Sequence, residues 1–415
     1  MRYLIYIFAI FISPLVAADA GTYFQIALEK NARLAEEAQL AAATREEHLR
    51  ESIFNNNPEL SVGLMNVPTR TFPAINRDSM SGLSVGISQR LALPWEAHFR
   101  KAEAEWRATN AALAVELQKA VLRYDVYEKF NAVLFYTKRA KNLANTKRLI
   151  VATLKVLSVP RKDARNIASQ ILEARASLAT QENTILENEY ELEKAWLDLS
   201  ALCGQNLERR SGEDALKAWE DLSLLTLPKS EDITAALLYK KSAQEVNTAE
   251  AMASLARAST FPEVTLSASY LFRQQVPGSS MNDDMISVAA STPFPFFYSL
   301  KNRHDIAAIN NRVEAARAHL LETERQLTAQ IAAEKTRFHA LVKAAENSTK
   351  AILPAHSSAH HSQLTTLNLT GSSAAEALIA YRMYLTADEE HLKQVRDAHA
   401  AFHRLHYLLA GGLTP

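Results

Sequence analysis

Four short segments of the chain alternate between apolar and small or polar residues. They lie at 60–65, 83–88, 264–270 and 286–291. In each segment one set of alternate side chains is apolar, and the other set is mostly serine, threonine, glycine or alanine. A period of two is typical of a β-strand with one apolar face. We therefore predict four strands, which with their flanks reach the roughly 9–11 residues of a membrane-spanning strand.

Most of the remaining sequence favours long helices. Stretches without glycine or proline run through 95–159, 161–203, 296–353 and 372–410 and are rich in good helix formers. A helix of about 60 residues spans roughly 90 Å. It needs neighbours along its whole length, so we expect a bundle or a coiled coil. The many charges on these stretches indicate solvated helix faces, with a polar channel lining as the alternative.

The order of elements occurs twice. The segment from Asn57 to Leu64 resembles the segment from Phe261 to Ala268. The two lie about 200 positions apart, which is too long a period for a solenoid repeat. We predict two structural copies, 19–230 and 231–415, each with a helix, two strands and a long helical hairpin.

The first 18 residues have the pattern of a targeting segment. Arg2 precedes a mostly apolar stretch from Tyr3 to Val16, and small residues follow it. We expect a secretory signal peptide at 1–18, cleaved after Ala18 or Ala20. The alternative is a retained membrane anchor, but the apolar stretch is shorter than the about 20 residues of a spanning helix.

Composition excludes several classes of protein. Positive and negative side chains balance at 46 each, which argues against a strongly basic nucleic-acid binder. A single cysteine excludes an internal disulfide framework and a cysteine-rich zinc module. The sequence contains no evident acid–base pair, nucleophile set or phosphate-binding loop. We therefore expect neither an enzyme nor a cofactor.

Two groups of histidines are candidate metal ligands, and they consist of His356, His360, His361, His399, His403 and His406. His399 and His403 lie one helical turn apart and could share a metal ion. No cysteine or carboxylate set completes a site, so we interpret the histidines as packed or solvated and predict no metal site. Cys203, just before Gly204, is expected in a buried apolar position at a helix end.

With strands, helices and duplication in this order, the chain resembles the TolC-type outer-membrane efflux factors. The segment from Gly86 to Pro94 is similar to the family's second strand, which runs through a proline into a long helix. The segments 352–354 and 369–382 are similar to its helix-turn-helix near the C-terminus. The ending from Leu408 to Leu413 looks closest to the cation-efflux branch of the CzcC type.

This resemblance implies a mainly α-helical fold with a membrane β-barrel part. Three chains of four strands would form a twelve-stranded barrel in the outer membrane, an even number as such barrels require. The helices would continue as a coiled-coil tunnel in the periplasm. The implied partners are two further copies, outer-membrane lipid, a periplasmic adaptor and an inner-membrane pump expected to be proton-driven, with no nucleic acid. The implied function is a passive exit duct for small solutes, heavy-metal cations among them.

The resemblance also implies two helix-hairpin turns at the far end of the tunnel. The expected adaptor contacts are Val156, Leu157, Pro160, Asp163, Leu369, Thr370, Gly371 and Ser372. The expected gate residues are Arg161, Lys162, Asp163 and Glu376. The chain departs from the family at Ile379, where an acidic residue is usual, and in the first turn, which has no glycine.

Two alternative functions remain open from the sequence. One is a duct of the same fold that serves type I protein secretion with a different pump. The other is a soluble periplasmic coiled-coil scaffold or adaptor, in which the four strands form ordinary hairpins.

Overall fold

The structure is a computed structural model. It describes residues 19–51, 57–70, 72–73, 78, 80–91, 93–158, 164–207, 209, 213–227, 232–259, 263–274, 283–293, 298–370 and 374–410. The expected signal peptide at 1–18 lies outside this part, so its assignment stays a prediction.

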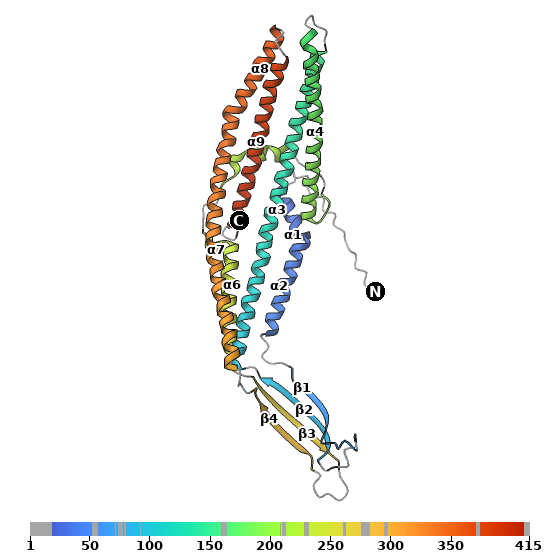
Figure 1. Cartoon of the computed structure of the whole chain (residues 1–415), viewed down its shortest axis with the longest axis vertical. Helices are drawn as coiled ribbons and strands as arrows, with labels where there is room; N and C mark the ends of the chain where they lie inside the picture. Colours follow the sequence, from blue (N-terminus) through green and yellow to red (C-terminus); the bar gives the residue numbers. More distant parts are fainter. Residues whose placement is uncertain are drawn as a thin grey trace, which may run out of the picture. The chain divides into compact units, whose positions relative to one another are not determined.

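Helices dominate the described part of the chain (Figure 1), as the glycine- and proline-free stretches predict. The helices are α1 (Ala20–Lys30), α2 (Ala32–Glu51), α3 (Pro94–Leu157), α4 (Ala164–Cys203), α5 (Glu213–Glu220), α6 (Leu237–Ala258), α7 (Tyr298–Asn347), α8 (Leu353–Thr370) and α9 (Ala374–Leu408). The strands are β1 (Glu59–Met65), β2 (Gly82–Leu91), β3 (Val264–Arg273) and β4 (Met285–Ser291). The prediction of a mainly helical chain with four strands is therefore confirmed.

The helical path around Pro354 differs from the sequence prediction. We expected the third long helix to end at 353, but helical structure continues to Thr370. A π-helical turn, Ser348–Ile352, connects α7 to α8. Proline is tolerated in the first turn of a helix because its missing N–H would be unpaired there in any case. The wider π-helical turn accommodates Pro354 without ending the helical path. The chain therefore reverses direction only after α8.

The four strands form one antiparallel sheet in the order β1-β2-β3-β4. The two central strands, β2 and β3, belong to different halves of the sequence and pair over ten residues, from Gly82 with Arg273 to Leu91 with Val264. The sheet thus joins the two proposed copies through their inner strands and leaves β1 and β4 at its edges. The division into copies at 19–230 and 231–415 itself stays a prediction.

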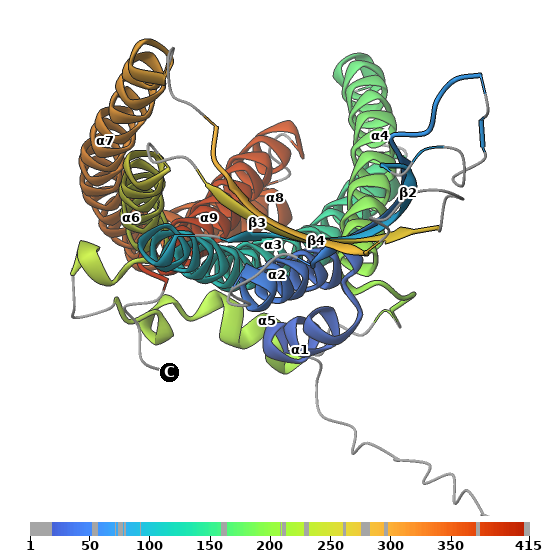
Figure 2. The same cartoon turned by 90° about the horizontal axis from the view of Figure 1, so that it is seen from below.

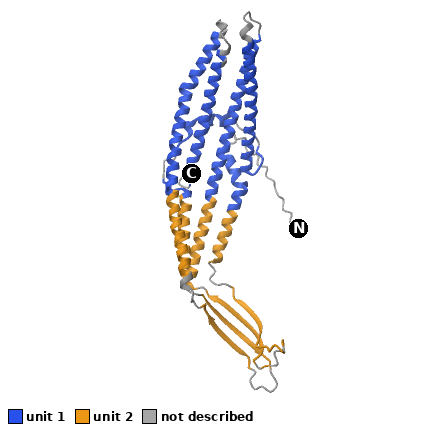
Figure 3. Ribbon diagram, viewed as in Figure 1, with its two compact units in different colours: residues 1–37, 116–238, 324–415 blue, residues 38–115, 239–323 orange. Residues whose placement is uncertain are grey.

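The chain divides into two compact units (Figure 3). Unit 1 comprises 1–37, 116–238 and 324–415, and unit 2 comprises 38–115 and 239–323. In unit 1 the middle of α3 is buried on several sides, with Val126 and Val133 fully inaccessible to solvent. Leu199 of α4 and Val395 of α9 are buried to the same extent. Helix α3 is therefore a central helix of unit 1, as its broad apolar face predicts.

The short helix α5 ties α3 to α9 within unit 1. Trp219 of α5 is only 3% exposed. Its Nε1 donates a 2.7 Å hydrogen bond to Oδ1 of Asn131 in α3. The Asn131 amide in turn donates to the carbonyl of Arg396 in α9 at 2.8 Å. Because buried polar groups cost free energy when unpaired, this closed network fixes the three helices at one level.

In unit 2 the helix α6 lies beside α7 (Figures 1 and 2). The side chain of Arg317 in α7 forms a 2.7 Å ion pair with Glu250 of α6, and Ser242 Oγ donates to Thr323 Oγ1 at 3.3 Å. On its other side α6 contacts α3, where Gln244 Nε2 donates to the carbonyl of Trp106 at 3.3 Å.

Gly204 ends α4 in a left-handed conformation, with φ +63°. A Cβ atom at this position would lie 2.6 Å from the carbonyl oxygen of Lys30, at the end of α1. Only glycine fits both the backbone angle and this close approach. The preceding Cys203 is buried, and its Sγ approaches the carbonyl of Tyr23 at 3.5 Å. Burial raises the pKa of this thiol to about 11, so Cys203 has the inert structural role that the sequence predicts.

Replacing Gly204 with alanine tests this helix end. We expect Gly204→Ala to lower the free energy of unfolding by about 1–2 kcal/mol or more, because the left-handed region alone costs an L-residue that much. The matched control is Gly21→Ala in α1, where the nearest heavy atom to the new Cβ is 3.6 Å away. Thermal unfolding monitored by circular dichroism should show a lower midpoint for Gly204→Ala only. Equal midpoints for the two variants would contradict this interpretation.

Candidate functional site

The register of the sheet places its apolar side chains in continuous rows across all four strands. Val62 of β1 pairs with Val85 of β2, which pairs with Tyr270 of β3, and Tyr270 pairs with Ile286 of β4. The adjacent row on the same face consists of Leu60, Ile87, Ala268 and Val288. Directly paired residues point to the same side of a sheet. One face of the sheet is therefore apolar except at Gln89, which pairs with Leu266 at its end.

The opposite face carries mostly small and polar residues, with Met65, Leu271 and Met285 as the exceptions near one end. Ser61, Gly86, Ser269 and Ser287 form one row there. A Cβ at Gly86 would lie 2.8 Å from Oγ of Ser61 and 3.2 Å from Cβ of Ser269, so this row is narrow and requires glycine. At one end of the sheet, Arg90 forms a 3.3 Å ion pair with Glu263. The alternation predicted from sequence is thus kept in register across the middle rows of all four strands.

Nothing in the described part of the chain covers the apolar face along the edge strands. Leu60, Val62, Ile286 and Val288 are 74%, 64%, 73% and 78% exposed. Contiguous exposed apolar surface of this kind marks contact with lipid or with another protein. The outer edges of β1 and β4 pair with no other strand of the described chain. Within the described chain, the apolar face of the sheet is therefore uncovered, and the backbone groups at its two outer edges have no strand to pair with.

None of the described helices combines the length and the continuous apolar character of a membrane-spanning helix.

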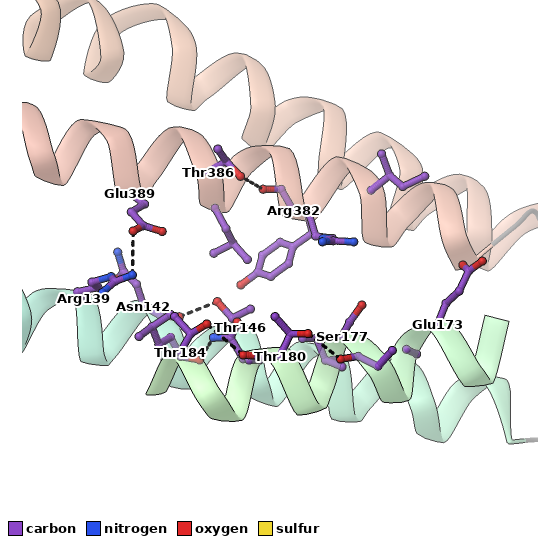
Figure 4. Close-up of a pocket in the computed structure, with 18 of the residues that line it drawn as sticks. Arg139, Asn142, Thr146, Glu173, Ser177, Thr180, Thr184, Arg382, Thr386 and Glu389 are labelled. Carbon is purple, nitrogen blue, oxygen red and sulfur yellow. Dashed lines mark hydrogen bonds and ion pairs between the residues drawn. The ribbon is translucent and has the colours of Figure 1, made fainter. Parts of the chain in front are cut away.

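A polar cleft of about 500 Å³ lies in unit 1 between α3, α4 and α9 (Figure 4). Thr180 and Thr184 project into it from α4, and Arg382 and Thr386 project from α9. One end of the cleft is closed by Arg139 of α3, which forms a 3.0 Å ion pair with Glu389 of α9. The helices that form the two predicted hairpins thus face each other across hydroxyl, amide and charged groups.

A second contact joins α3 to α9 close to the Arg139–Glu389 ion pair. The amide of Asn142 donates a hydrogen bond to the carboxylate of Asp388. Burial raises the pKa of Asp388, and the nearby charge of Lys138 opposes that rise. Lys138 itself forms an ion pair with Glu220 of α5. Arg139, Lys138 and Asp388 thus each have a polar partner at this position, namely Glu389, Glu220 and Asn142.

Solved structures of known channels have the same arrangement of strands and helices. The open-state MtrE outer-membrane channel of Neisseria gonorrhoeae superimposes with a TM-score of 0.80 at 16% identity, covering 95% of this chain and 89% of that one. CusC gives 0.76 at 14% identity, with 94% and 91% covered. The outer-membrane protein VceC of Vibrio cholerae gives 0.74 at 15% identity, with 94% and 95% covered. No family model matches the chain, and no curated protein matches it by sequence.

The chain has the TolC-type channel fold. At identities of this size the likeness concerns the fold, and it confirms the fold class that the sequence resemblance implies. These neighbours do not single out the CzcC-like branch.

Within the TolC-type fold, the two predicted turns lie between consecutive helices. The first separates the end of α3 at Leu157 from the start of α4 at Ala164, and the second separates α8 from α9. Leu157 is buried against Ala174 of α4, so it holds the hairpin together. Glu376, in the first turn of α9, is exposed.

The remaining predicted site residues lie where no side chain is described. The backbone at Val156, Leu369 and Thr370 is helical. Pro160, Arg161, Lys162, Asp163, Gly371 and Ser372 lie outside the described residues. Adaptor contact and gating at these turns stay predictions.

The C-terminal histidines are packed in the core of unit 1. His399 Nε2 donates a 2.8 Å hydrogen bond to the carbonyl of Trp219, and the His403 ring lies 4.7 Å from that of Tyr127. Burial lowers the pKa of His403 to about 3, with neighbouring His399, His406 and Arg123 adding to the effect. Burial also lowers the pKa values of His399 and His406. In the described part of the chain no group of His, Cys, Asp or Glu is arranged to hold a metal ion.

The α5 contact and the Arg139–Glu389 ion pair between α3 and α9 were not predictable from the sequence motifs. Asn131 is a polar residue in an otherwise apolar stretch of α3, and this position could have indicated a buried hydrogen bond. Nothing in the sequence indicates the pairing of Asn142 with Asp388, because the two residues lie far apart in the chain and neither belongs to a motif.

The buried histidines predict a specific pH dependence. Above pH 6.5 the folded and unfolded chains both hold His403 neutral, so it has no effect on stability. Below the ordinary histidine pKa of 6.5, His403 becomes protonated in the unfolded chain. In the folded chain it stays neutral down to a pKa of about 3. Stability must therefore fall as the pH drops through this interval.

We expect His403→Phe, which keeps an aromatic ring against Tyr127, to reduce that fall. The measurement is the unfolding midpoint as a function of pH between 7 and about 4, a range that spans most of the histidine transition. The control His304→Phe, at an exposed position of α7, should leave the pH profile as in the wild type. A His403→Phe profile as steep as that of the wild type would show that this ring is not kept neutral by burial.

Proposed function

We propose that the chain is a subunit of a trimeric outer-membrane channel, the passive exit duct of an efflux system. The observation that carries the proposal is the sheet with one continuous, uncovered apolar face and two unpaired edges. It is supported by the TolC-type fold, which covers more than nine-tenths of the chain in the three comparisons above. Those relatives include proteins described as outer-membrane or transmembrane channels.

Lipid is the environment that suits the apolar face. The central strands β2 and β3 have 10 residues each, which fits the roughly 9–11 residues of a spanning strand. The opposite face, with its serine and glycine rows, suits a water-filled interior. A soluble scaffold would leave Val62, Ile286 and Val288 in water, so the exposed face favours the channel over that alternative.

The open edges require further copies of the chain. Unpaired backbone groups cost several kcal/mol each in hydrocarbon, so a sheet in lipid must close on itself. A sheet of four strands is too narrow to close. If β4 of each copy pairs with β1 of the next, three copies yield twelve strands, within the range of known barrels. Backbone hydrogen bonding and the TolC-type fold together support the proposed homotrimer.

The helical part is then the periplasmic tunnel. We assign the turns at 156–163 and 369–376 to its far end, where they would contact a periplasmic adaptor and, through it, an inner-membrane pump. The charged residues Arg161, Lys162, Asp163 and Glu376 are the proposed gate. The protein itself makes and breaks no bond in this function, and the energy for transport comes from the pump.

We assign small solutes as the cargo of the channel, and heavy-metal cations are the first class to test. The C-terminal resemblance to the CzcC-like branch supports this choice, and the packed histidines of α9 indicate that cargo passes without a binding site there. Metal sensitivity of a deletion strain, compared with drug sensitivity and with loss of a secreted protein, distinguishes this cargo from the type I secretion alternative.

Two adjacent lysine substitutions test the membrane face. Val62 and Gly63 are neighbours on β1 but point to opposite faces, and a Cβ at Gly63 meets no heavy atom within 4 Å. We expect Val62→Lys to lose outer-membrane assembly, because a lysine on the lipid face costs up to about 2–4 kcal/mol per copy. Gly63→Lys should assemble and conduct ions in planar bilayers, as the wild type should. Equal recovery of both variants in the outer membrane would contradict a lipid-facing sheet.

Site-specific crosslinking tests the assignment of the turns. A photoreactive amino acid at Arg161 or Thr370 should capture the adaptor in intact cells. The control position is the exposed Glu187, roughly 35 Å along α4 from Ala164 at 1.5 Å per residue. Capture of the adaptor from Glu187 and from neither turn would show that docking occurs elsewhere on the helices.

A further inference from the structure

A separate cavity of about 320 Å³ lies within unit 1, between α1, α3 and α9. Phe24 of α1 lines one side, residues from Glu116 to Tyr127 of α3 line a second, and Phe402 to Ala410 close a third. The cavity shares no lining residue with the polar cleft of Figure 4. It plays no part in the proposed duct, so it needs its own explanation.

Aromatic side chains make up most of the wall. Tyr124 and Tyr407 lie with ring centroids 5.7 Å apart, and Tyr127 lies 4.7 Å from His403. The guanidinium of Arg404 lies over both Tyr124 and Tyr407, at 5.6 and 5.1 Å. Because each ring is held by a neighbour, the wall is preformed and offers flat apolar surfaces to a ligand.

The charged residues of the wall are Glu116, Lys119 and Arg123. Lys119 is neutralised by Glu116, whose carboxylate lies 2.7 Å from its Nζ. Arg123 lies 5.6 Å from the centre of the Tyr127 ring and, among the residues that the structure describes, forms no ion pair. The buried Nε2 of His406 has no hydrogen-bond partner in the same part of the chain. One positive charge and one vacant hydrogen-bonding atom therefore line a largely aromatic cavity.

We propose that this cavity binds a small organic anion with a single aromatic or similarly flat ring, such as an aromatic carboxylate. The anionic group pairs with Arg123 and satisfies His406, and the ring lies between the tyrosines. The volume, at the lower end of the range of known ligand sites, suits a molecule of one ring. Arg123 is exposed, and its positive charge would attract an anion and repel a cation.

Three probes of similar size test the charge preference, namely benzoate, benzyl alcohol and benzylamine. Binding to the purified full-length protein in detergent is measured by isothermal titration calorimetry and by saturation-transfer NMR of the probe. We expect benzoate to bind with a dissociation constant of about 1 mM or tighter. The other two probes should bind at least tenfold more weakly. Comparable binding of all three would overturn the proposal, since micelle partition or apolar contact would then explain it.

Two variants locate the site. Arg123→Gln should weaken benzoate binding at least tenfold and leave benzyl alcohol unchanged. The control Arg148→Gln, an exposed arginine on the same helix, removes the same charge and should have no effect. Ala120→Leu adds bulk to the cavity wall without changing charge and should abolish benzoate binding with an unchanged unfolding midpoint.

These results are independent of transport, because no readout requires a membrane, an adaptor or a pump. Benzoate binding that survives both Arg123→Gln and Ala120→Leu would place the anion elsewhere and overturn the assignment. Absence of saturable benzoate binding to the wild type would overturn it as well.

Discussion

In a bilayer the backbone must satisfy its own hydrogen bonds, because hydrocarbon offers no partner for an exposed N–H or C=O group. In the proposed channel, this constraint accounts for the form of the sheet. Its four strands form three complete antiparallel ladders, yet β1 and β4 each present an open edge, and the apolar face beside those edges is uncovered. Such a sheet is unstable alone in lipid and exposed to aggregation in water. In the proposed channel, pairing between copies closes the strand edges, and lipid covers the apolar face.

The helical part depends on a different kind of interaction. Unit 1 is held by an apolar core around Val126, Leu199 and Val395, and the core is crossed by hydrogen bonds that connect Asn131, Trp219 and Arg396. Ion pairs and amide contacts between α3 and α9 lie at the adjacent level. Buried polar links of this kind add little net stability but specify one arrangement of the helices. The α5 contact therefore fixes how the two hairpins face each other.

The sequence predicted those features that depend on local patterns. Period-two alternation located all four strands, and the absence of glycine and proline located the long helices. The predicted end of the helix before Pro354 was wrong. Proline is compatible with the first turn of α8, and a π-helical turn before it lets the helical path continue. The Trp219–Asn131 pair and the polar cleft were not predictable, since both arise from helices that approach only in the folded chain. The buried state of the histidines was one of two interpretations left open by their spacing.

The central claim is that several chains share one barrel, and the mass of the particle extracted from membranes tests it most directly. Native mass spectrometry or light scattering of the detergent-solubilised protein should give three chains per particle, with no release from membranes by salt or carbonate. A monomer that remains soluble without detergent would contradict the account, because the apolar face and both strand edges would then tolerate water.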